Sequence, residues 1–427
     1  MAMSPGMQVL RRTKRDAKSS PSLHNAAVPM KKAPTILQVV PWLDSGGVER
    51  GTVDITQAIT EAGGKALVAA EPGRLVPQLE EAGGELLPFE GRSKHPWTML
   101  VSNVQVLENM IRERKVDLVH ARSRAPAWSA LLAARRAGVP FVTTYHGAYS
   151  QKGQFKAFYN SVMARGDVVI ANSDYTAALV ASRNPTAKDR TVSIYRGIDM
   201  AAFDPAAVST DRTDALAKAW DLSGDPLIIL PSRLTRWKGQ SFILPVMGAL
   251  KKAGLGFKLV LIGDDQGREA YVAELDQLIA EHDLTDCVRR VGYWSDMPAA
   301  YKRADLAIVP SQDAETFGRS AAESLAMGTP VLVGDLGAQP EVIACPDGVD
   351  PARWIARSIT HNNPEGWQAA IALQLTQQKG MGAAAIADLA SIARAQMERR
   401  FSLKSMGEQT LAVYDQLLGT ALASAKL

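Results

Sequence analysis

Residues 313–334 constrain the fold of this chain more than any other segment, because they place a loop, a helix start and a strand in fixed order. A short apolar run at 304–309 precedes them and ends at Pro310, as expected of a buried parallel strand. Residues 319–327 then carry small and apolar side chains at helical spacing, and Gly328 is a typical helix stop before the next apolar run. The segment predicts a strand, loop, helix and strand of a parallel sheet.

The same alternation runs through most of the chain and predicts the fold class. Apolar runs alternate with helical patterns on both sides of a polar stretch at 205–225. The other expected strands are 35–40, 65–69, 85–89, 118–120, 141–144, 168–171, 193–199, 227–230, 257–262 and 288–291. We therefore predict an α/β protein with two doubly wound, Rossmann-like parallel-sheet domains facing a cleft, over residues 34–205 and 206–400.

Two glutamates flank the predicted helix start in the opening segment. In open parallel sheets, ligands bind beyond the carboxyl ends of the strands, and a helix N-terminus there offers free N–H groups to an anion. The backbone of Phe317, Gly318 and Arg319 is well placed to donate. Glu315 precedes the helix and Glu323 lies about one turn inside it, so the two carboxylates are expected to accept hydrogen bonds from hydroxyls on different parts of one ligand. The alternative is a loop charge and a solvated helix residue.

Two further loops follow predicted strands and suit an anion. Gly46 and Gly47 lie between a strand and a helix, where glycine lets the backbone approach a phosphate closely, although a Gly-Gly pair alone is most often only a turn. Arg233 and Lys238 follow the strand that begins the second sheet. A guanidinium fork and a lysine point charge can neutralise a diphosphate as it leaves, whereas the alternative is ordinary surface charge.

These residues and their neighbours match a known signature. The resemblance to the E-x7-E motif of retaining GT-B glycosyltransferases, the group often called family 4, is carried by Glu315, Phe317, Gly318, Glu323 and the strings at 326–331 and 337–341. It covers residues 35–420 and implies the GT-B fold, with a last segment, 401–427, whose helix at 404–418 packs back across to the first domain. It also implies that Glu315 and residues 317–319 contact the donor sugar, and that Glu323 contacts the nucleotide ribose.

Other loops extend the resemblance and show two departures from it. The Gly46 loop resembles a G-G-x-E-x loop that faces the donor diphosphate and the acceptor. The loop with Arg233 and Lys238 resembles G-R-L-x-x-x-K-G, which implies diphosphate binding, with Ser232 in place of the glycine. Arg196 stands where the family's N-G-[IV]-D turn usually has Asn, and we expect this departure to alter donor or acceptor contacts.

Two histidines compete for a place at the reacting centre. His146 follows the strand at 141–144 and precedes Gly147, where it can hydrogen-bond a sugar hydroxyl or stabilise developing charge. It resembles the histidine of a T-x-H-[GD] setting close to the donor sugar, so we assign it a catalytic role beside Glu315. His120 ends the strand at 118–120 and is expected to be structural or to line the acceptor site.

Composition gives no sign of a disulfide framework or a metal cluster. Cys287 and Cys345 are the only cysteines, and the six histidines show no ligand spacing, which favours a reducing, cytoplasmic compartment. The adjacent carboxylates of Asp264 and Asp265 are compatible with a metal site. In the resembled family, however, this position is a turn beside the nucleotide, and these enzymes generally need no metal. We expect neither metal nor cofactor, the nucleotide sugar being a substrate.

The net charge of +4 belongs to the N-terminal tail. Residues 1–33 hold seven basic side chains and one acidic side chain, so the tail carries +6 and the remainder −2. Lacking a hydrophobic period, the tail is expected to be disordered. It could attract an anionic membrane surface, be a merely solvated extension, or reflect a true start at Met30.

A second membrane interpretation concerns Trp97, which lies near basic residues such as Lys94. The alternative is that the basic residues around Arg112 are C-terminal helix charges favoured by the helix dipole. No apolar run approaches the roughly 18 residues of a spanning helix, so we expect a soluble or peripheral protein.

The resemblance implies transfer of a hexose from a nucleoside diphosphate sugar to a glycan or lipid-linked acceptor, with retention of configuration. Cations on one side of the cleft are expected to draw off the diphosphate, while Glu315 and His146 hold the sugar opposite. Residues 317–319 and 326–328 resemble bacterial enzymes of lipopolysaccharide core or other cell-surface glycans. A GT-B nucleotide-sugar epimerase and a non-catalytic nucleotide-sugar-binding scaffold are the rivals, and no nucleic-acid partner is expected.

Overall fold

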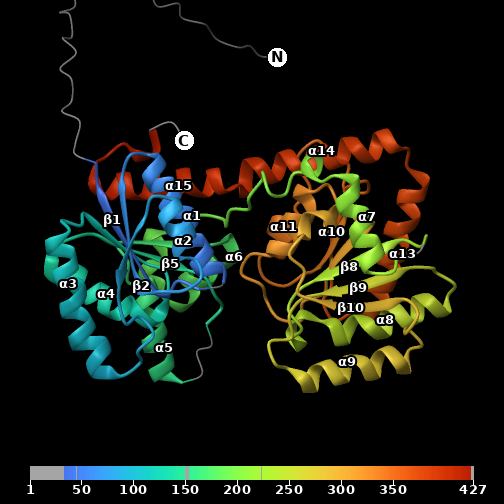
Figure 1. Cartoon of the computed structure of the whole chain (residues 1–427), viewed down its shortest axis with the longest axis horizontal. Coiled ribbons are helices and arrows are strands. Elements are labelled where there is room, and N and C mark those ends of the chain that lie inside the picture. Colours follow the sequence, from blue (N-terminus) through green and yellow to red (C-terminus); the bar gives the residue numbers. More distant parts are fainter. Residues whose placement is uncertain (1–32, 45, 150–152, 223, 425–427) are drawn as a thin grey trace, which may run out of the picture. The chain divides into compact units, whose positions relative to one another are not determined.

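The computed structural model describes residues 33–44, 46–149, 153–222 and 224–424. The tail predicted at 1–33 lies outside them except for its last position. Two parallel sheets organise the described chain, each with helices packed against it (Figure 1). The predicted fold class, two Rossmann-like domains of the GT-B kind, is confirmed.

The first domain is built on a seven-stranded sheet in the order β3-β2-β1-β4-β5-β6-β7. Its strands are β1 (Thr35–Trp42), β2 (Lys65–Glu71), β3 (Glu85–Pro88), β4 (Leu118–Ala121), β5 (Phe141–Tyr145), β6 (Val168–Ala171) and β7 (Thr191–Ser193). Its helical segments are α1 (Gly47–Glu61), α2 (Val76–Glu81), η1 (Thr98–Ser102), α3 (Asn103–Glu113), α4 (Arg124–Ala137), α5 (Gln154–Asn160), η2 (Ser161–Ala164), α6 (Asp174–Arg183) and η3 (Pro185–Arg190). The strand order reverses at β1 and β4, which is where such sheets hold ligands.

The second domain is built on a six-stranded sheet in the order β10-β9-β8-β11-β12-β13. Its strands are β8 (Leu227–Pro231), β9 (Lys258–Ile262), β10 (Val288–Gly292), β11 (Leu306–Val309), β12 (Val331–Gly334) and β13 (Ala356–Ile359). Its helical segments are η4 (Pro205–Ala207), α7 (Thr210–Ala219), η5 (Arg236–Lys238), α8 (Gln240–Lys252), α9 (Glu269–Glu281), α10 (Met297–Arg303), α11 (Arg319–Ala326), α12 (Gln339–Val342), α13 (Pro364–Gly380) and α14 (Ala383–Phe401). The predicted unit around residues 313–334 is β11, its loop, α11 and β12.

The chain ends with α15 (Leu403–Leu418) and η6 (Leu422–Ser424), which return to the first domain. Helix α15 packs on α1 (Figure 1). Met406, Leu411 and Tyr414 share a buried cluster with Ile36 and Ile55. The predicted return of the last helix is therefore confirmed. Among the described helices, none combines the length and the apolarity that a bilayer span requires.

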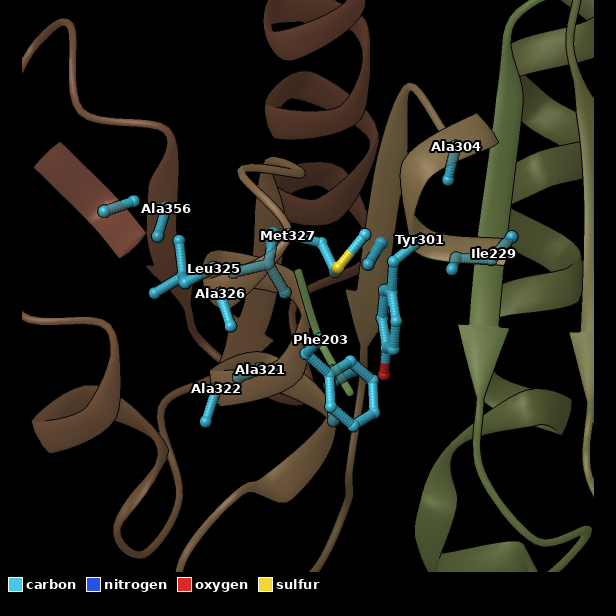
Figure 2. Packing of buried hydrophobic residues seen from close by; sticks show 14 of the residues in the cluster. Phe203, Ile229, Tyr301, Ala304, Ala321, Ala322, Leu325, Ala326, Met327 and Ala356 are labelled. Carbon is cyan, nitrogen blue, oxygen red and sulfur yellow. The ribbon is translucent and has the colours of Figure 1, made fainter. Parts of the chain in front are cut away.

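Small residues let α11 sit close to the second sheet. Ala321, Ala322 and Ala326 are fully buried in the largest core cluster (Figure 2). Phe203 enters the same cluster from the segment after the first sheet, and its ring lies 6.1 Å from that of Tyr301 in an edge-on arrangement (Figure 2). The site-bearing helix is thus fixed by dense packing on its inner face.

The connection between the sheets differs from the expectation at its start. The predicted strand at 193–199 is wrong beyond Ser193, because the backbone of Ile198 hydrogen-bonds Phe401 and Leu403 instead of continuing the sheet. The polar stretch at 205–225, where the sequence predicts the domain boundary, contains α7. Its Leu216 is buried in the core of the second sheet, so α7 packs as part of the second domain.

Candidate active site

Loops from both sheets line a cleft of about 770 Å³. The predicted site residues in its wall are Gly46, Gly47, His146, Arg233 and Arg319. Lys238, Glu315, Phe317, Gly318 and Glu323 are not part of that wall. Glu323 is hydrogen-bonded to Arg319 of the wall, and Thr316, next to Glu315, is hydrogen-bonded to His146. The geometry thus divides the predicted residues into five that line the cleft and five that lie behind it, and their roles stay predictions.

Lys238 and Glu315 form an ion pair that is largely, but not fully, shielded from solvent. The Nζ atom lies 2.7 Å from Oε1, and the two side chains are only 13% and 11% exposed. Ser311 Oγ donates to the same carboxylate oxygen at 2.5 Å. The expectation that the cation and this carboxylate lie on opposite sides of the cleft is wrong, because both loops come from neighbouring strands of one sheet.

Glycines hold both halves of this pair in place. Gly239, which follows Lys238, has φ +81°, and a Cβ there would lie 1.9 Å from the carbonyl oxygen of Pro310. Gly337 has φ +71° and a Cβ there would lie 2.1 Å from the carbonyl oxygen of Glu315. Only glycine fits either position without moving backbone. The Lys238 loop is therefore fixed against the end of β11, and the Glu315 loop is fixed against the loop after β12.

Arg233 faces the cleft from the loop after β8, where its Nη1 donates to Gln266 Oε1 at 3.3 Å. Asp264 and Asp265 use their carboxylates to close the next turn, accepting from the N–H groups of Gln266 and Gly267. Within residues 33–44, 46–149, 153–222 and 224–424, no group of three or more His, Cys, Asp or Glu side chains could hold a metal ion. The expected absence of a metal stays a prediction.

Glu323 is buried behind Arg319 at the start of α11. Its carboxylate accepts from Arg319 Nε at 2.6 Å and from the Tyr301 hydroxyl at 3.2 Å. Burial raises the pKa of Glu323, and the Arg319 charge opposes that rise. The Phe317 ring is buried against Phe401, 5.8 Å between centroids, so only the backbone of Phe317 can serve a ligand.

His146 occupies the loop after β5 with both ring nitrogens buried and without a hydrogen-bond partner among the described residues. Burial, with Arg196 and Arg122 nearby, holds its pKa well below the usual range, so the ring is neutral at pH 7. Its carbonyl oxygen accepts from Thr316 Oγ1 at 2.9 Å, which ties this loop to the loop that carries Glu315. A neutral imidazole with free nitrogens can donate to, or accept from, a ligand hydroxyl.

His120, the competing histidine, is structural. Its Nδ1 lies 2.7 Å from the Tyr414 hydroxyl, and its Nε2 lies 2.7 Å from Thr144 Oγ1. Both nitrogens are therefore used to join α15 to β4 and β5.

Five charged residues of the cleft wall were not predicted as site residues: Arg50, Asp54, Arg122, Arg196 and Asp199. Arg122 follows β4 directly, as His146 follows β5, so the rule that ligands bind at strand ends could have found it. Asp54 lies seven positions after Gly47 on α1 and so shares its helix face. In the sequence, Arg196 is distinguished only by departing from the family's turn motif.

Glu341, in the string at 337–341, makes a contact across the two domains. Its carboxylate accepts from the N–H groups of Asp174 and Tyr175, at 2.9 and 2.5 Å, and from the Tyr195 hydroxyl at 3.1 Å. Asp174 begins α6, so a carboxylate of the second domain caps a helix of the first.

Two family models together match most of the folded chain. The model described as Glycosyltransferase Family 4 matches residues 45–202, and the model described as Glycosyl transferases group 1 matches residues 213–381. A solved glycosyltransferase from Rickettsia africae is 30% identical, with a TM-score of 0.81, over 91% of this chain and 99% of that one.

The chain belongs to the family 4, group 1 glycosyltransferases.

Two more relatives of this glycosyltransferase show the range of the family. A D-inositol 3-phosphate glycosyltransferase of Xylanimonas cellulosilytica is 29% identical over 73% of this chain and 82% of that protein. The HepE protein of Anabaena, solved in complex with UDP, is 22% identical with a TM-score of 0.75, over 90% of this chain and all of that one, and shares its fold. The predicted family resemblance is confirmed.

Proposed function

We propose that this glycosyltransferase transfers a hexose from a nucleoside diphosphate sugar to a hydroxyl of a glycan or lipid-linked acceptor, with retention of configuration. The buried pair of Lys238 and Glu315 carries the proposal. Lys238 is a cation that can bind a phosphate, and Glu315 is a carboxylate that can accept from sugar hydroxyls. The two side chains are hydrogen-bonded to each other, so they can bind adjoining parts of one donor molecule. The UDP held by HepE supports a uridine nucleotide as the first donor to test.

When the donor binds, the hydrogen bond between Lys238 and Glu315 is replaced by hydrogen bonds between each side chain and the donor. Sugar hydroxyls donate to Glu315, while Lys238 and Arg233 donate to the diphosphate, so each charge keeps a partner. As the bond from the anomeric carbon to the phosphate oxygen breaks, negative charge grows on that oxygen, and the two cations stabilise it. The acceptor oxygen forms its bond on the same face, and its proton passes to the leaving phosphate oxygen.

His146 serves the sugar during this step. Its neutral ring has two free nitrogens in the cleft wall, which suits a hydrogen bond to a donor hydroxyl. Glu323 holds Arg319 at the helix start and, as the resemblance implies, contacts the ribose. No metal is required in this scheme, because fixed cations supply the positive charge that Mg²⁺ provides elsewhere.

The acceptor is proposed to belong to a bacterial cell-surface glycan, including lipopolysaccharide core, on the resemblance of residues 317–319 and 326–328. The inositol phosphate named for the Xylanimonas relative is an alternative acceptor to test. An epimerase would turn over the donor without any acceptor, and a scaffold would bind it without turnover.

One experiment separates these functions. Purified protein is incubated with UDP-glucose and other nucleotide sugars, with and without lipid and glycan extracts, and released nucleotide is measured. Wild type should release nucleotide faster with the right extract. Lys238→Ala should lose donor binding, and Glu315→Ala should bind donor but fail to transfer. Equal turnover in both variants, or an acceptor-independent change of the donor sugar, would contradict the proposal.

A peripheral membrane contact is part of the proposal. Trp97, Phe155 and Phe158 are 66%, 85% and 58% exposed, and Arg165 lies over the Phe158 ring. The segments that carry these rings both contact α4. Ser129 of α4 donates to the carbonyl oxygen of Met99, and its neighbour Trp128 donates to the carbonyl oxygen of Tyr159. Exposed aromatic rings beside basic residues suit an anionic lipid surface.

Co-sedimentation with vesicles that contain one third phosphatidylglycerol, or about that share, tests this contact. The double variant Trp97→Ser, Phe155→Ser should remain in the supernatant while wild type pellets. Equal pelleting of both proteins, or a dimer that the variant abolishes, would overturn it.

A further inference from the structure

We propose that the first-domain side of the cleft is a binding site for an anionic group, a phosphate or a carboxylate, carried by the acceptor. The inference rests on the proposed transfer reaction and adds a substrate class to it. Its central residues are Arg122, after β4, and Arg196, in the loop after β7.

Neither Arg122 nor Arg196 forms an ion pair with a carboxylate among the described residues. Arg122 is only 4% exposed, and its Nε has no hydrogen-bond partner. Within the described part of the chain, neither guanidinium donates a side-chain hydrogen bond or lies within 4.0 Å of a carboxylate. A buried charge without a partner is unfavourable, and a bound anion would satisfy it.

Helix α1 is shaped to admit these two side chains. A Cβ at Gly47 would lie 2.4 Å from Arg196 Nη1, and a Cβ at Gly51 would lie 3.1 Å from Arg122 Nη2. The two glycines are four positions apart, so they lie on the same face of the helix. Glycine inside a helix costs about 1 kcal/mol relative to alanine, and at Gly51 the absent side chain leaves room for a guanidinium.

The charges around the site leave it positive. Burial, together with Arg319 and Arg122, lowers the pKa of Arg196 to about 10. Asp54 is a carboxylate that interacts electrostatically with four arginines, Arg319, Arg50, Arg122 and Arg196. Burial raises the pKa of Asp54 to about 6. Asp54 and Glu49 are the carboxylates that act on Arg196, and Asp54 also acts on Arg122. Arg319 is already paired with Glu323, whereas among the described residues no carboxylate forms an ion pair with Arg122 or Arg196, so an anion entering from the cleft is favoured there.

An acceptor fits this site better than the donor. The cations proposed for the donor diphosphate, Arg233 and Lys238, belong to the second domain. Arg122 and His146 follow the adjacent strands β4 and β5 of the first domain, so an anion on Arg122 lies beside the histidine proposed to touch the transferred sugar. That is where an attacking acceptor must be held.

The test measures donor and anion binding separately on the full-length protein. UDP affinity is measured first by calorimetry. Then, at saturating UDP, myo-inositol 1-phosphate is titrated against neutral myo-inositol, and galacturonate against galactose, with inorganic phosphate as the minimal probe. Wild type should prefer one anionic probe over its neutral partner by at least about tenfold, which is the contribution of one charge-assisted hydrogen bond. The two pairs distinguish a phosphate from a carboxylate.

Arg122→Gln and Arg196→Asn should remove that preference while leaving UDP affinity unchanged. The second variant carries the residue that the resembled family usually has there and changes a half-buried side chain, so it remains informative if Arg122→Gln fails to fold. Arg136→Gln, on the exposed end of α4, is the control. An equal loss of UDP affinity in the site variants would assign these arginines to the donor instead, and equal binding of charged and neutral probes by wild type would overturn the proposal. Absence of nucleotide binding in wild type would refute the proposed function itself.

Discussion

The Nζ atom of Lys238 lies 2.7 Å from Oε1 of Glu315, in an ion pair almost closed to solvent. Removing one partner leaves a buried charge, which is unfavourable by about 3 kcal/mol or more, whereas removing both leaves none. We expect Lys238→Met and Glu315→Gln each to lower the free energy of unfolding, and the double variant to recover most of the loss. Urea denaturation of the four proteins measures this, and single variants as stable as wild type would show that the pair is not coupled in solution.

The pair depends on the turn at Gly239. With φ +81° and the Pro310 carbonyl 1.9 Å from a new Cβ, Gly239→Ala should destabilise the second domain by about 3 kcal/mol or more and weaken donor binding. Gly254→Ala is the matched control, because φ is +83° there and no atom lies within 4 Å of the new Cβ. It should lose only the backbone term of about 1–2 kcal/mol. Similar melting temperatures for the two variants would contradict the steric argument.

The buried ring of His146 predicts a dependence of stability on pH. Its folded-state pKa lies well below the unfolded value of about 6.5, so below that pH the unfolded chain binds a proton that the folded chain does not. Stability therefore falls as the pH drops below about 6.5, by up to about 1.4 kcal/mol per pH unit for this residue. Asp54 acts in the opposite sense between about pH 6 and pH 4, because its pKa is raised.

Unfolding measured from pH 7 to pH 5 tests the histidine term. His146→Asn should show a shallower loss than wild type. His120 contributes in the same direction and remains in both proteins, so the difference reports His146 alone. Parallel curves would mean that the ring is solvated and free to titrate.

The Glu341 carboxylate predicts a link between the domains. Glu341→Ala removes the acceptor for two N–H groups at the start of α6, and should lower stability by about 1–2 kcal/mol. Amide exchange of Asp174 and Tyr175 should accelerate as well. Glu365→Ala, an exposed acidic residue in the first turn of α13, is the control and should change neither.

Metal removal should leave transfer unchanged. Arg233 and Lys238 are proposed to supply the positive charge, so activity in excess EDTA should equal that in Mg²⁺. A loss in EDTA that Mg²⁺ restores would contradict the metal-independent scheme.

The sequence by itself determined the fold class and the family, and it named five residues of the cleft wall, because alternating apolar periods and glycine-bounded loops are local properties. It missed β13, whose half-polar pattern at a sheet edge gives a weak signal, and extended β7 through a turn that bonds to residues 401–403.

Only the tertiary structure decided which charges meet. It paired Lys238 with Glu315, assigned His120 to a structural role, and brought Arg122 and Arg196 onto the glycine face of α1. The two hydrogen bonds of His120, for example, join it to residues 24 and 294 positions away in the sequence. No local sequence pattern encodes a partner at such a distance. Charge placement depends on how loops from separate strands converge, and that is fixed by packing.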